Sequence, residues 1–241
     1  MELSGASIVT VPPLLSPESI ADLCVQLNSA FADPATHVLV IRGDEQNFCR
    51  GLDLCRAVCE KDAGPALESF ARCLGAIRMG IKPVVAVVQS VAAAGGLGLA
   101  AACDAVLATD EATFTLTELL FGLFPSIIFP YLAERVSPQK LRWMALSAQT
   151  LNAHEAMQAG LVDFVCPSEK LPFVLRSWVR RLRRPQPQAV AMWKESTAEP
   201  SVFSSSRGVA LTLERLRDPD VRAGFLDFSE TGRLPSRRSD P

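Results

Sequence analysis

The chain has 241 residues and 49% of them are hydrophobic, so it can bury a sizeable core and could form one large domain or two small ones. Its 24 basic and 26 acidic residues leave a net charge of −2, which argues against a general nucleic-acid or membrane-surface binder, because such proteins usually carry a basic excess. The apolar runs end well before the roughly 20 residues of a membrane span, and the start MELSGASIVTV lacks a secretory pattern, so we expect a cytoplasmic protein.

The seven cysteines and two histidines give no sign of a metal site. The cysteine count is odd, no CxxC pair occurs, and neither His37 nor His154 stands at ligand spacing from a cysteine. We therefore expect the cysteines to be small buried hydrophobes with a few surface thiols, and we expect no metal and no cofactor. The histidines are poor catalytic candidates, because His37 begins a strand and His154 lies on an amphipathic helix.

The first half of the chain alternates between helical and strand patterns. Apolar residues at helical spacing after the helix-opening sequence SPES predict an amphipathic helix over 16–31 with Ser16 as its N-cap. Residues 63–79 also look helical, and the runs HVLVIRG, KPVVAVVQS, DAVLAT and ATFTL predict strands. This alternation favours a parallel sheet with crossover helices.

Helical patterns dominate from Glu118 onward. TELLFGL, IFPYLAERVS, PQKLRWMALSA and NAHEAMQAGL predict helices, and VDFV predicts a short strand. The segment after Pro167 is helical and basic. A solvated helix face is the default interpretation of its arginines, and docking of an acidic carrier protein or a coenzyme phosphate is the alternative. These arginines are Arg180, Arg181, Arg183 and Arg184.

Two segments bring a glycine close to the end of a predicted strand: NFCRGLD after HVLVIRG, and AAAGGLGLAAACD after KPVVAVVQS. Sites in such folds gather at the carboxyl ends of parallel strands. If the backbone N–H groups of Leu52 and Gly95 converge there, they form two fixed donors for one oxyanion. Gly95 would also begin a helix over 96–103, whose dipole favours negative charge. A glycine after a strand is, by itself, more often only a turn.

Three motifs favour a functional site over simple turns, because together they resemble the crotonase (enoyl-CoA hydratase/isomerase) superfamily throughout residues 38–167. They are VLVIRGDEQNFCRGLDL, IKPVVAVVQSVAAAGGLGLAAACDAVLATDEATFTLTELLFGLFP and LNAHEAMQAGLVDFVCP, in family order and spacing. The resemblance implies an α/β fold, with a crotonase-type spiral of ββα turns over 1–165. It implies a helical region for trimerisation or as a lid over 166–241, and we expect the tail 233–241 to be frayed.

The resemblance also implies a homotrimer or a dimer of trimers, and substrates that are acyl thioesters on the pantetheine of coenzyme A or an acyl carrier protein. Leu52 and Gly95 match the two amides that hold the thioester carbonyl in the family. Family hydratases use two glutamates; the first position here is Gly98, so that carboxylate is absent, and the second matches Glu118. A lone carboxylate beside an oxyanion hole can move a proton at the α carbon, and apolar neighbours should raise its pKa.

Several residues around these motifs allow two interpretations. Glu118 could instead be a solvated acid at a helix start. Gly98 could serve close helix packing, or leave room for a branched acyl group. Gly96, Asp53 and Tyr131 complete the candidate pocket; Asp53 could supply a second acid, although its place after Leu52 favours a helix N-cap. Four cations flank the motifs and could pair with a substrate carboxylate, although a solvated role is their default. They are Arg50, Arg56, Arg78 and Lys82.

The segments FCRGLD, AAAGGLGLAAACDAVLAT and LFGLFPSIIFPYL look most like the dehydratases of polyketide β-branching cassettes. The resemblance implies that 3-hydroxy-3-methylglutaryl on an acyl carrier protein is dehydrated to 3-methylglutaconyl by a hydro-lyase. Glu118 would be the base, and either Glu118 or a second acid would protonate the departing hydroxyl. The alternatives are an enoyl-thioester isomerase, a decarboxylase, and a catalytically silent crotonase-fold scaffold.

Overall fold

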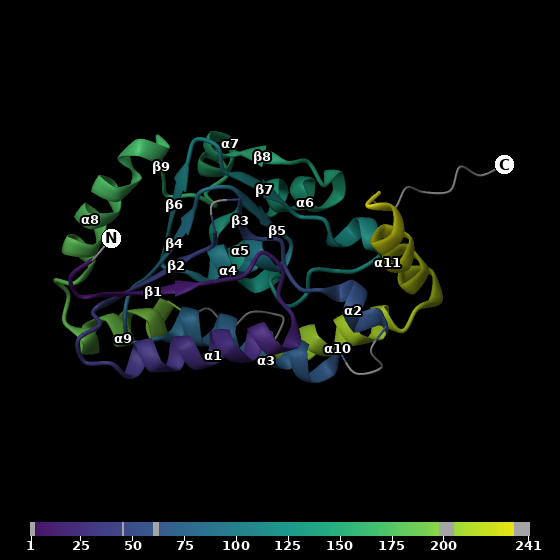
Figure 1. Cartoon of the computed structure of the whole chain (residues 1–241), viewed down its shortest axis with the longest axis horizontal. Helices are drawn as coiled ribbons and strands as arrows, with labels where there is room; N and C mark the ends of the chain where they lie inside the picture. The colour runs from purple at the N-terminus through teal and green to yellow at the C-terminus, as the bar shows by residue number, and fades with distance from the viewer. Residues whose placement is uncertain (1–2, 45, 60–62, 198–204, 234–241) are drawn as a thin grey trace.

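A computed structural model describes residues 3–44, 46–59, 63–197 and 205–233 of the chain. These residues contain a larger, wholly parallel sheet of strand order β1-β2-β4-β6-β9 (Figure 1). Its strands are β1 (Ala6–Thr10), β2 (Val38–Arg42), β4 (Val84–Val88), β6 (Ala105–Thr109) and β9 (Phe164–Cys166). β2 and β4 are almost continuously buried, which agrees with their apolar sequences.

A smaller sheet of strand order β3-β5-β7-β8 lies beside it, parallel except for the antiparallel β7–β8 pair. Its strands are β3 (Asn47–Cys49), β5 (Val91–Ala93), β7 (Thr113–Thr115) and β8 (Leu151–Asn152). The chain therefore visits both sheets in each turn, in the pairs β2 and β3, β4 and β5, and β6 and β7. This confirms the expected α/β class and the spiral of paired strands. β3 and β5 are too short to give a recognisable sequence pattern.

The helices surround the two sheets. They are α1 (Pro17–Ala32), α2 (Leu54–Cys59), α3 (Gly64–Met79), α4 (Gly95–Ala102), the 3₁₀-helix η1 (Glu118–Phe121), α5 (Phe129–Arg135), α6 (Pro138–Ser147), α7 (Ala153–Gln158), the 3₁₀-helix η2 (Ser168–Lys170), α8 (Leu171–Leu182), α9 (Pro187–Thr197), α10 (Ser205–Leu216) and α11 (Pro219–Thr231). α1 begins at the predicted N-cap Ser16, whose hydroxyl accepts the N–H of Ser19 in a capping box. TELLFGL forms only the single turn η1, because the chain reverses at Gly122 in a left-handed conformation.

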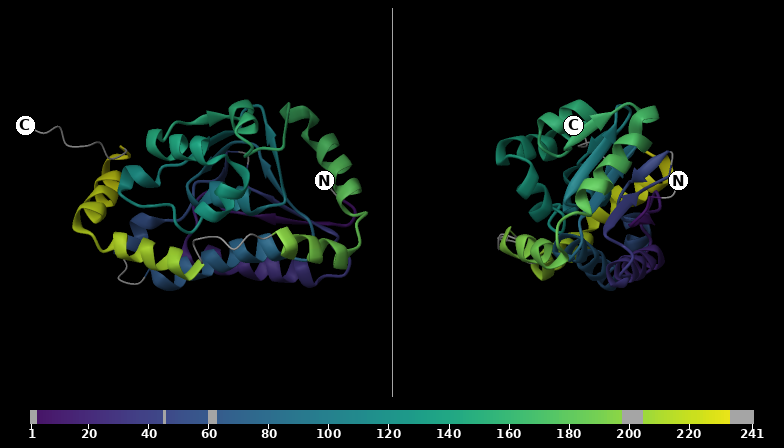
Figure 2. Two further views of the ribbon diagram at one scale, coloured as in Figure 1. Left: turned by 180° about the vertical axis from the view of Figure 1, so that it is seen from behind. Right: turned by 90° about the vertical axis from the view of Figure 1, so that its left-hand side faces the viewer.

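Four helices lie along one side of the molecule: α1, α3, α9 and α10 (Figure 1). α8 and α11 lie at opposite ends, as the front and back views show (Figures 1 and 2). The arginines of α8 are exposed, at the end of the molecule opposite α11. The predicted boundary at 165 falls within β9, which pairs with β6 in the larger sheet, and the division of the chain at that point stays a prediction. Most of the predicted tail, 234–241, lies outside the described residues.

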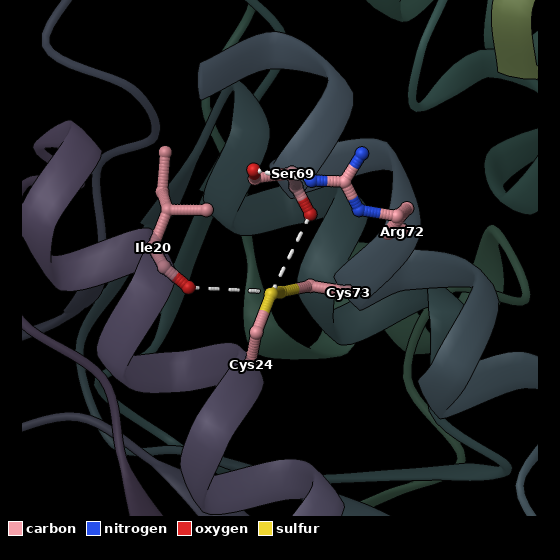
Figure 3. The surroundings of a disulfide bond; sticks show 5 residues. All are labelled: Ile20, Cys24, Ser69, Arg72 and Cys73. Atoms are coloured by element: carbon pink, nitrogen blue, oxygen red, sulfur yellow. Dashed lines mark hydrogen bonds between the residues drawn. A yellow bond between two sulfur atoms is a disulfide. The ribbon is translucent and has the colours of Figure 1, made fainter. Parts of the chain in front are cut away.

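The cysteines differ from the expectation at one place. Cys24 of α1 and Cys73 of α3 form a disulfide, with their Cα atoms 5.6 Å apart (Figure 3). The pairing depends on the packing of α1 against α3, which residues 49 positions apart in the chain do not reveal. Cys49, Cys103 and Cys166 are buried and outside any disulfide, as expected, and the partly buried Cys55 donates from its thiol to the Phe225 carbonyl at 3.5 Å.

Two lysines are buried and structural. Lys82, expected on the surface, donates from Nζ to the carbonyl oxygens of Ala30 (3.0 Å) and Asp33 (2.6 Å), which end α1. Lys194 of α9 donates to the Asp104 carboxylate at 2.8 Å and to the Ile77 carbonyl at 3.0 Å. Each buried charge thus has hydrogen-bond partners, and Lys194 fastens α9 to the end of α3.

Candidate active site

The smaller sheet brings three candidate groups together. β5 pairs with β3 on one side and with β7 on the other, all parallel. Leu52 follows β3, Gly95 follows β5 and Glu118 follows β7, so the three groups leave the carboxyl ends of three neighbouring strands. Register therefore places side by side residues that are far apart in the chain.

The N–H of Leu52 points away from Leu15, with which Leu52 forms an isolated parallel β-bridge. The flanking residues pair with Leu15: the N–H of Leu15 donates to the carbonyl of Gly51 at 2.8 Å, and the N–H of Asp53 donates to the carbonyl of Leu15 at 2.9 Å. Because successive N–H groups of extended backbone alternate in direction, the Leu52 N–H faces the other side. That side carries Gly95, since Leu52 and Gly95 line a common cavity.

The N–H of Gly95 is the first of α4, so it has no intrahelical acceptor. It is aimed by Ala94, whose φ of 46° and ψ of −123° are unusual for a residue with a side chain. The N–H of Ala94 donates to the Thr115 carbonyl at 3.0 Å, which ties the end of β5 to the end of β7. A Cβ on Gly51 would lie 2.7 Å from the Gly95 nitrogen, so Gly51 permits this close approach.

Glu118 presents a carboxylate in this space. Its Oε2 atom is buried and has no hydrogen-bond partner among the described residues. Burial raises the pKa of Glu118 to about 7. Hydrogen bonds from the backbone of Glu118 and of Thr117 act in the opposite direction and lower the pKa by less. The expected direction of the shift is thus confirmed, and the carboxyl can change protonation state near neutral pH.

Two cavities meet at these groups, and both are lined by Leu52, Leu54, Ala94, Glu118 and Leu123. The large cavity has a volume of about 370 Å³. It is completed by Leu14, Arg50, Asp53, Cys55, Ala93, Thr117, Phe121, Phe225 and Phe228. The small cavity has a volume of about 60 Å³. It is completed by Leu67, Phe70, Gly95, Phe124, Pro125, Ser126, Ile127, Ile128 and Thr212.

Asp53 lines the large cavity, as predicted. Its Oδ1 atom also accepts the N–H of Arg56 at 3.0 Å, so it caps the first turn of α2. The carboxylate therefore has the helix-capping role that its position favoured, at the edge of the cavity.

Gly96, Gly98 and Tyr131 line neither cavity. The expected room at Gly98 is not there, because a Cβ on Gly98 would collide with Ile128, which fills the space and forms part of the small cavity's wall. Gly96 likewise packs against the backbone of Cys49. Close packing is therefore the correct interpretation of Gly98, and Tyr131 is a buried residue of α5.

Three of the four flanking cations are engaged elsewhere. Arg56 pairs with Glu18 at 2.8 Å, Arg78 pairs with Glu134 at 2.8 Å, and Lys82 binds the end of α1 as described above. Arg50 is the one of the four that lines the large cavity.

The cavity residues that come from α10 and α11 were not predicted from the sequence. Thr212 of α10 and Ser126 are buried and lie 3.0 Å apart at the small cavity, while Phe225 of α11 stacks on Phe121 with 4.6 Å between ring centroids. Helical spacing alone could have indicated a buried face for Phe225. Nothing in the sequence indicates which cavity that face would meet.

The described residues contain no cluster of three or more histidine, cysteine or acidic side chains placed to hold a metal ion. Among the helices of these same residues, none combines the length and the apolarity that crossing a bilayer requires.

The chain is similar to known proteins along nearly its whole length. The bacillaene synthase dehydratase PksH of Bacillus subtilis is 31% identical over 90% of this chain and 86% of its own length. The (E)-benzylidenesuccinyl-CoA hydratase of Thauera aromatica is 30% identical over 93% and 90%. A crystal structure described as a polyketide biosynthesis enoyl-CoA hydratase (PksH) from Bacillus subtilis superimposes with a TM-score of 0.81 at 26% identity, covering 96% of both chains.

The profile of one protein family, enoyl-CoA hydratase/isomerase, matches residues 13–233. This match spans the spiral from α1 onward, the strand ends that carry Leu52, Gly95 and Glu118, and the helices α10 and α11 that complete the cavities. The chain therefore belongs to the enoyl-CoA hydratase/isomerase family, the crotonase superfamily.

Proposed function

We propose that the protein dehydrates 3-hydroxy-3-methylglutaryl on an acyl carrier protein to 3-methylglutaconyl, as a step of polyketide β-branching. Family membership makes it an enzyme of the hydratase and dehydratase class that acts on acyl thioesters. The relative PksH, named as a dehydratase of bacillaene synthase, supports the finer assignment. The observation that carries the proposal is the buried, unpartnered Oε2 of Glu118 beside the strand ends of Leu52 and Gly95.

The reaction begins when the thioester carbonyl accepts the N–H groups of Leu52 and Gly95. These donors, and the dipole of α4, stabilise the negative charge that develops on the oxygen as the α proton leaves. Ionised Glu118 takes that proton, and the bonding pair of the C–H bond forms the enolate. When the enolate collapses, the α–β double bond forms, the β C–O bond breaks, and the hydroxyl leaves.

Glu118 can complete the cycle alone. Once protonated it returns its proton to the departing hydroxyl, which leaves as water, so the carboxyl ends as it began. No other titratable side chain of the described residues lines the small cavity, and Asp53 in the large cavity is already engaged as a helix cap. A pKa of about 7 suits a group that must both accept and donate a proton near neutral pH.

The proposal places the thioester arm in the large cavity, which has room for a pantetheine chain, and the β carbon toward the small cavity. An acyl carrier protein is the proposed handle, with coenzyme A as the alternative, and no further cofactor is needed. A homotrimer or a dimer of trimers and a cytoplasmic location belong to the same proposal. A carrier would approach near α11, away from the arginines of α8 at the other end (Figure 1).

An enoyl-thioester isomerase is the second candidate. The same lone carboxyl favours it, because moving a proton between the α and γ carbons needs one acid–base group and no bound water. A decarboxylase would use the oxyanion donors without needing a base at the α carbon. A silent scaffold would need neither, and the raised pKa and free Oε2 of Glu118 argue against it.

The test is to incubate the protein with carrier protein loaded with 3-hydroxy-3-methylglutaryl and to measure the intact mass of the carrier. Loss of one water, absent with Glu118→Gln, is the expected result. An unchanged mass, together with conversion of a 3-enoyl to a 2-enoyl thioester, would replace the dehydratase by the isomerase. Loss of carbon dioxide in place of water would identify a decarboxylase.

A further inference from the structure

Arg50 stands at the edge of the large cavity with part of its guanidinium unused. Its Nε donates to the Asn47 side chain at 2.6 Å, which orients the group. Its two terminal nitrogens have no acceptor among the described residues. A guanidinium held through Nε still offers two parallel donors on its outer edge, the geometry that binds a carboxylate with two hydrogen bonds.

Among the residues that the structure describes, no other cation lines either cavity. The acidic groups of the large cavity are Asp53 and Glu118; Asp53 accepts a backbone N–H as a cap, and Glu118 titrates near neutral pH. The rest of the described lining is apolar apart from Thr117 and the Cys55 thiol, so Arg50 is the one described cation that an anion in the large cavity would meet.

The small cavity offers an anion nothing comparable. Its polar side chains besides Glu118 are the hydroxyls of Ser126 and Thr212. Ser126 donates to the Gly208 carbonyl at 2.7 Å, and Thr212 reaches the same oxygen at 3.1 Å. A carboxylate placed there would lose its hydration, find no positive charge, and lie near Glu118, which is unfavourable for a bare anion.

We infer that Arg50 binds a free carboxylate at the far end of the acyl group, so that the site selects dicarboxylic acyl thioesters. The acyl chain then bends back from the β carbon toward the large cavity, and its carboxylate meets the outer edge of the Arg50 guanidinium. The inference rests on the proposed function, because the acyl group proposed there carries such a carboxylate. It makes Arg50 a specificity residue without a part in the proton transfer.

The experiment measures binding without turnover. Two unreactive thioesters of pantetheine, glutaryl and pentanoyl, have the same chain length and differ in the terminal carboxylate. Pantetheine carries no phosphate, so any effect of charge comes from the acyl group. Isothermal titration of the wild-type protein should give tighter binding of the glutaryl thioester. Arg50→Gln should weaken glutaryl binding by about tenfold, the scale of one hydrogen-bonded charge contact, and change pentanoyl binding by less than about twofold.

Two variants make the comparison strict. Arg50→Lys keeps the charge and loses the paired donors, so it should retain part of the preference for glutaryl. Arg72→Gln removes an exposed arginine of α3 that lies outside both cavities, and it should change neither affinity.

Equal wild-type affinities for the two thioesters, including no measurable binding of either, would overturn the inference. Equal weakening of both by Arg50→Gln would do the same, because it would assign Arg50 to the pantetheine arm. The proposed function fails separately: a protein that prefers the glutaryl thioester through Arg50 but removes no water from the hydroxylated substrate keeps this subsite and loses the dehydratase assignment.

Discussion

The two cavities that meet at Glu118 differ in size and in charge. The large one has about 370 Å³, is lined by aromatic rings of α11 and η1, and carries Arg50 and Asp53 at its edge. The small one has about 60 Å³, and its described lining consists of Glu118, apolar groups and two neutral hydroxyls. The difference fits the proposed role of Glu118 as an acid–base group: the cavity assigned to the substrate arm is polar at its edge, while the apolar surroundings of the carboxyl raise its pKa.

Removing the carboxyl that the cavities share should have the largest effect. Glu118→Gln keeps the shape of both cavities but cannot take the α proton, so kcat for dehydration should fall by about 10³-fold. In the wild type, kcat/KM should rise with pH and level off above about 7, as Glu118 ionises in the free enzyme. Steady-state rates across pH 5–9 check both, with circular dichroism as the control for folding. A variant that retains a tenth of the activity would move the base elsewhere.

The next effect concerns stability. Glu118 has its folded pKa raised from 4.5 to about 7, so the folded state holds this proton when the unfolded state has lost it. Stability from this group is complete below pH 4.5 and declines as pH rises to about 7. Glu118→Gln has no such decline, and it should be more stable than the wild type by up to about 3 kcal/mol at pH 8, with little gain at pH 4.5. Urea unfolding at both pH values measures the difference in the free energy of unfolding between the two proteins. A difference that is the same at pH 4.5 and pH 8 would contradict the raised pKa of Glu118.

The wall of the small cavity should be sensitive to a single methyl group. Gly98→Ala pushes against Ile128, and we expect it to cost about 1–2 kcal/mol despite the better helix propensity of alanine, and to lower kcat/KM as Ile128 shifts. Gly75→Ala is the matched control, because Gly75 of α3 has open space where its Cβ would stand and should gain about 0.5–1 kcal/mol. Thermal unfolding of both variants measures the change in stability relative to the wild type. A change of the same sign in both variants would refute the close packing at Gly98.

The smallest effect should come from the hydroxyls of the small cavity. Ser126→Ala removes the donor to the Gly208 carbonyl, but Thr212 can still donate to that oxygen at 3.1 Å, so we expect a loss of about 1 kcal/mol. Binding of the glutaryl thioester should stay the same, because no anion is expected in this cavity. Weaker glutaryl binding in Ser126→Ala would place the carboxylate on the wrong side of Glu118.

The sequence predicted those features that depend on neighbours in the chain or on strand order. Ser16 caps α1 because the serine, proline and second serine of SPES are local. The meeting of Leu52, Gly95 and Glu118 could be predicted because the resemblance to a known spiral supplies the strand order, and each residue stands two or three positions after a strand of the smaller sheet.

The features that were missed depend on packing between distant segments. The Cys24–Cys73 disulfide requires contact between α1 and α3, and the close packing at Gly98 depends on Ile128 from a later loop. The lining of the small cavity is completed by α10, and that of the large cavity by α11. No periodicity in the sequence records which faces meet. TELLFGL has a helical pattern as well, yet Gly122 ends the helix after one turn.

The backbone of Ala94 sets a limit on how far this enzyme can be made more heat-resistant. Its φ of 46° lies in a region that suits glycine, and holding an alanine there costs about 1–3 kcal/mol. A selection for thermal tolerance would therefore favour glycine at position 94. The added backbone freedom would loosen the orientation of the Gly95 N–H, so under the proposed mechanism a more heat-resistant variant would have a lower kcat.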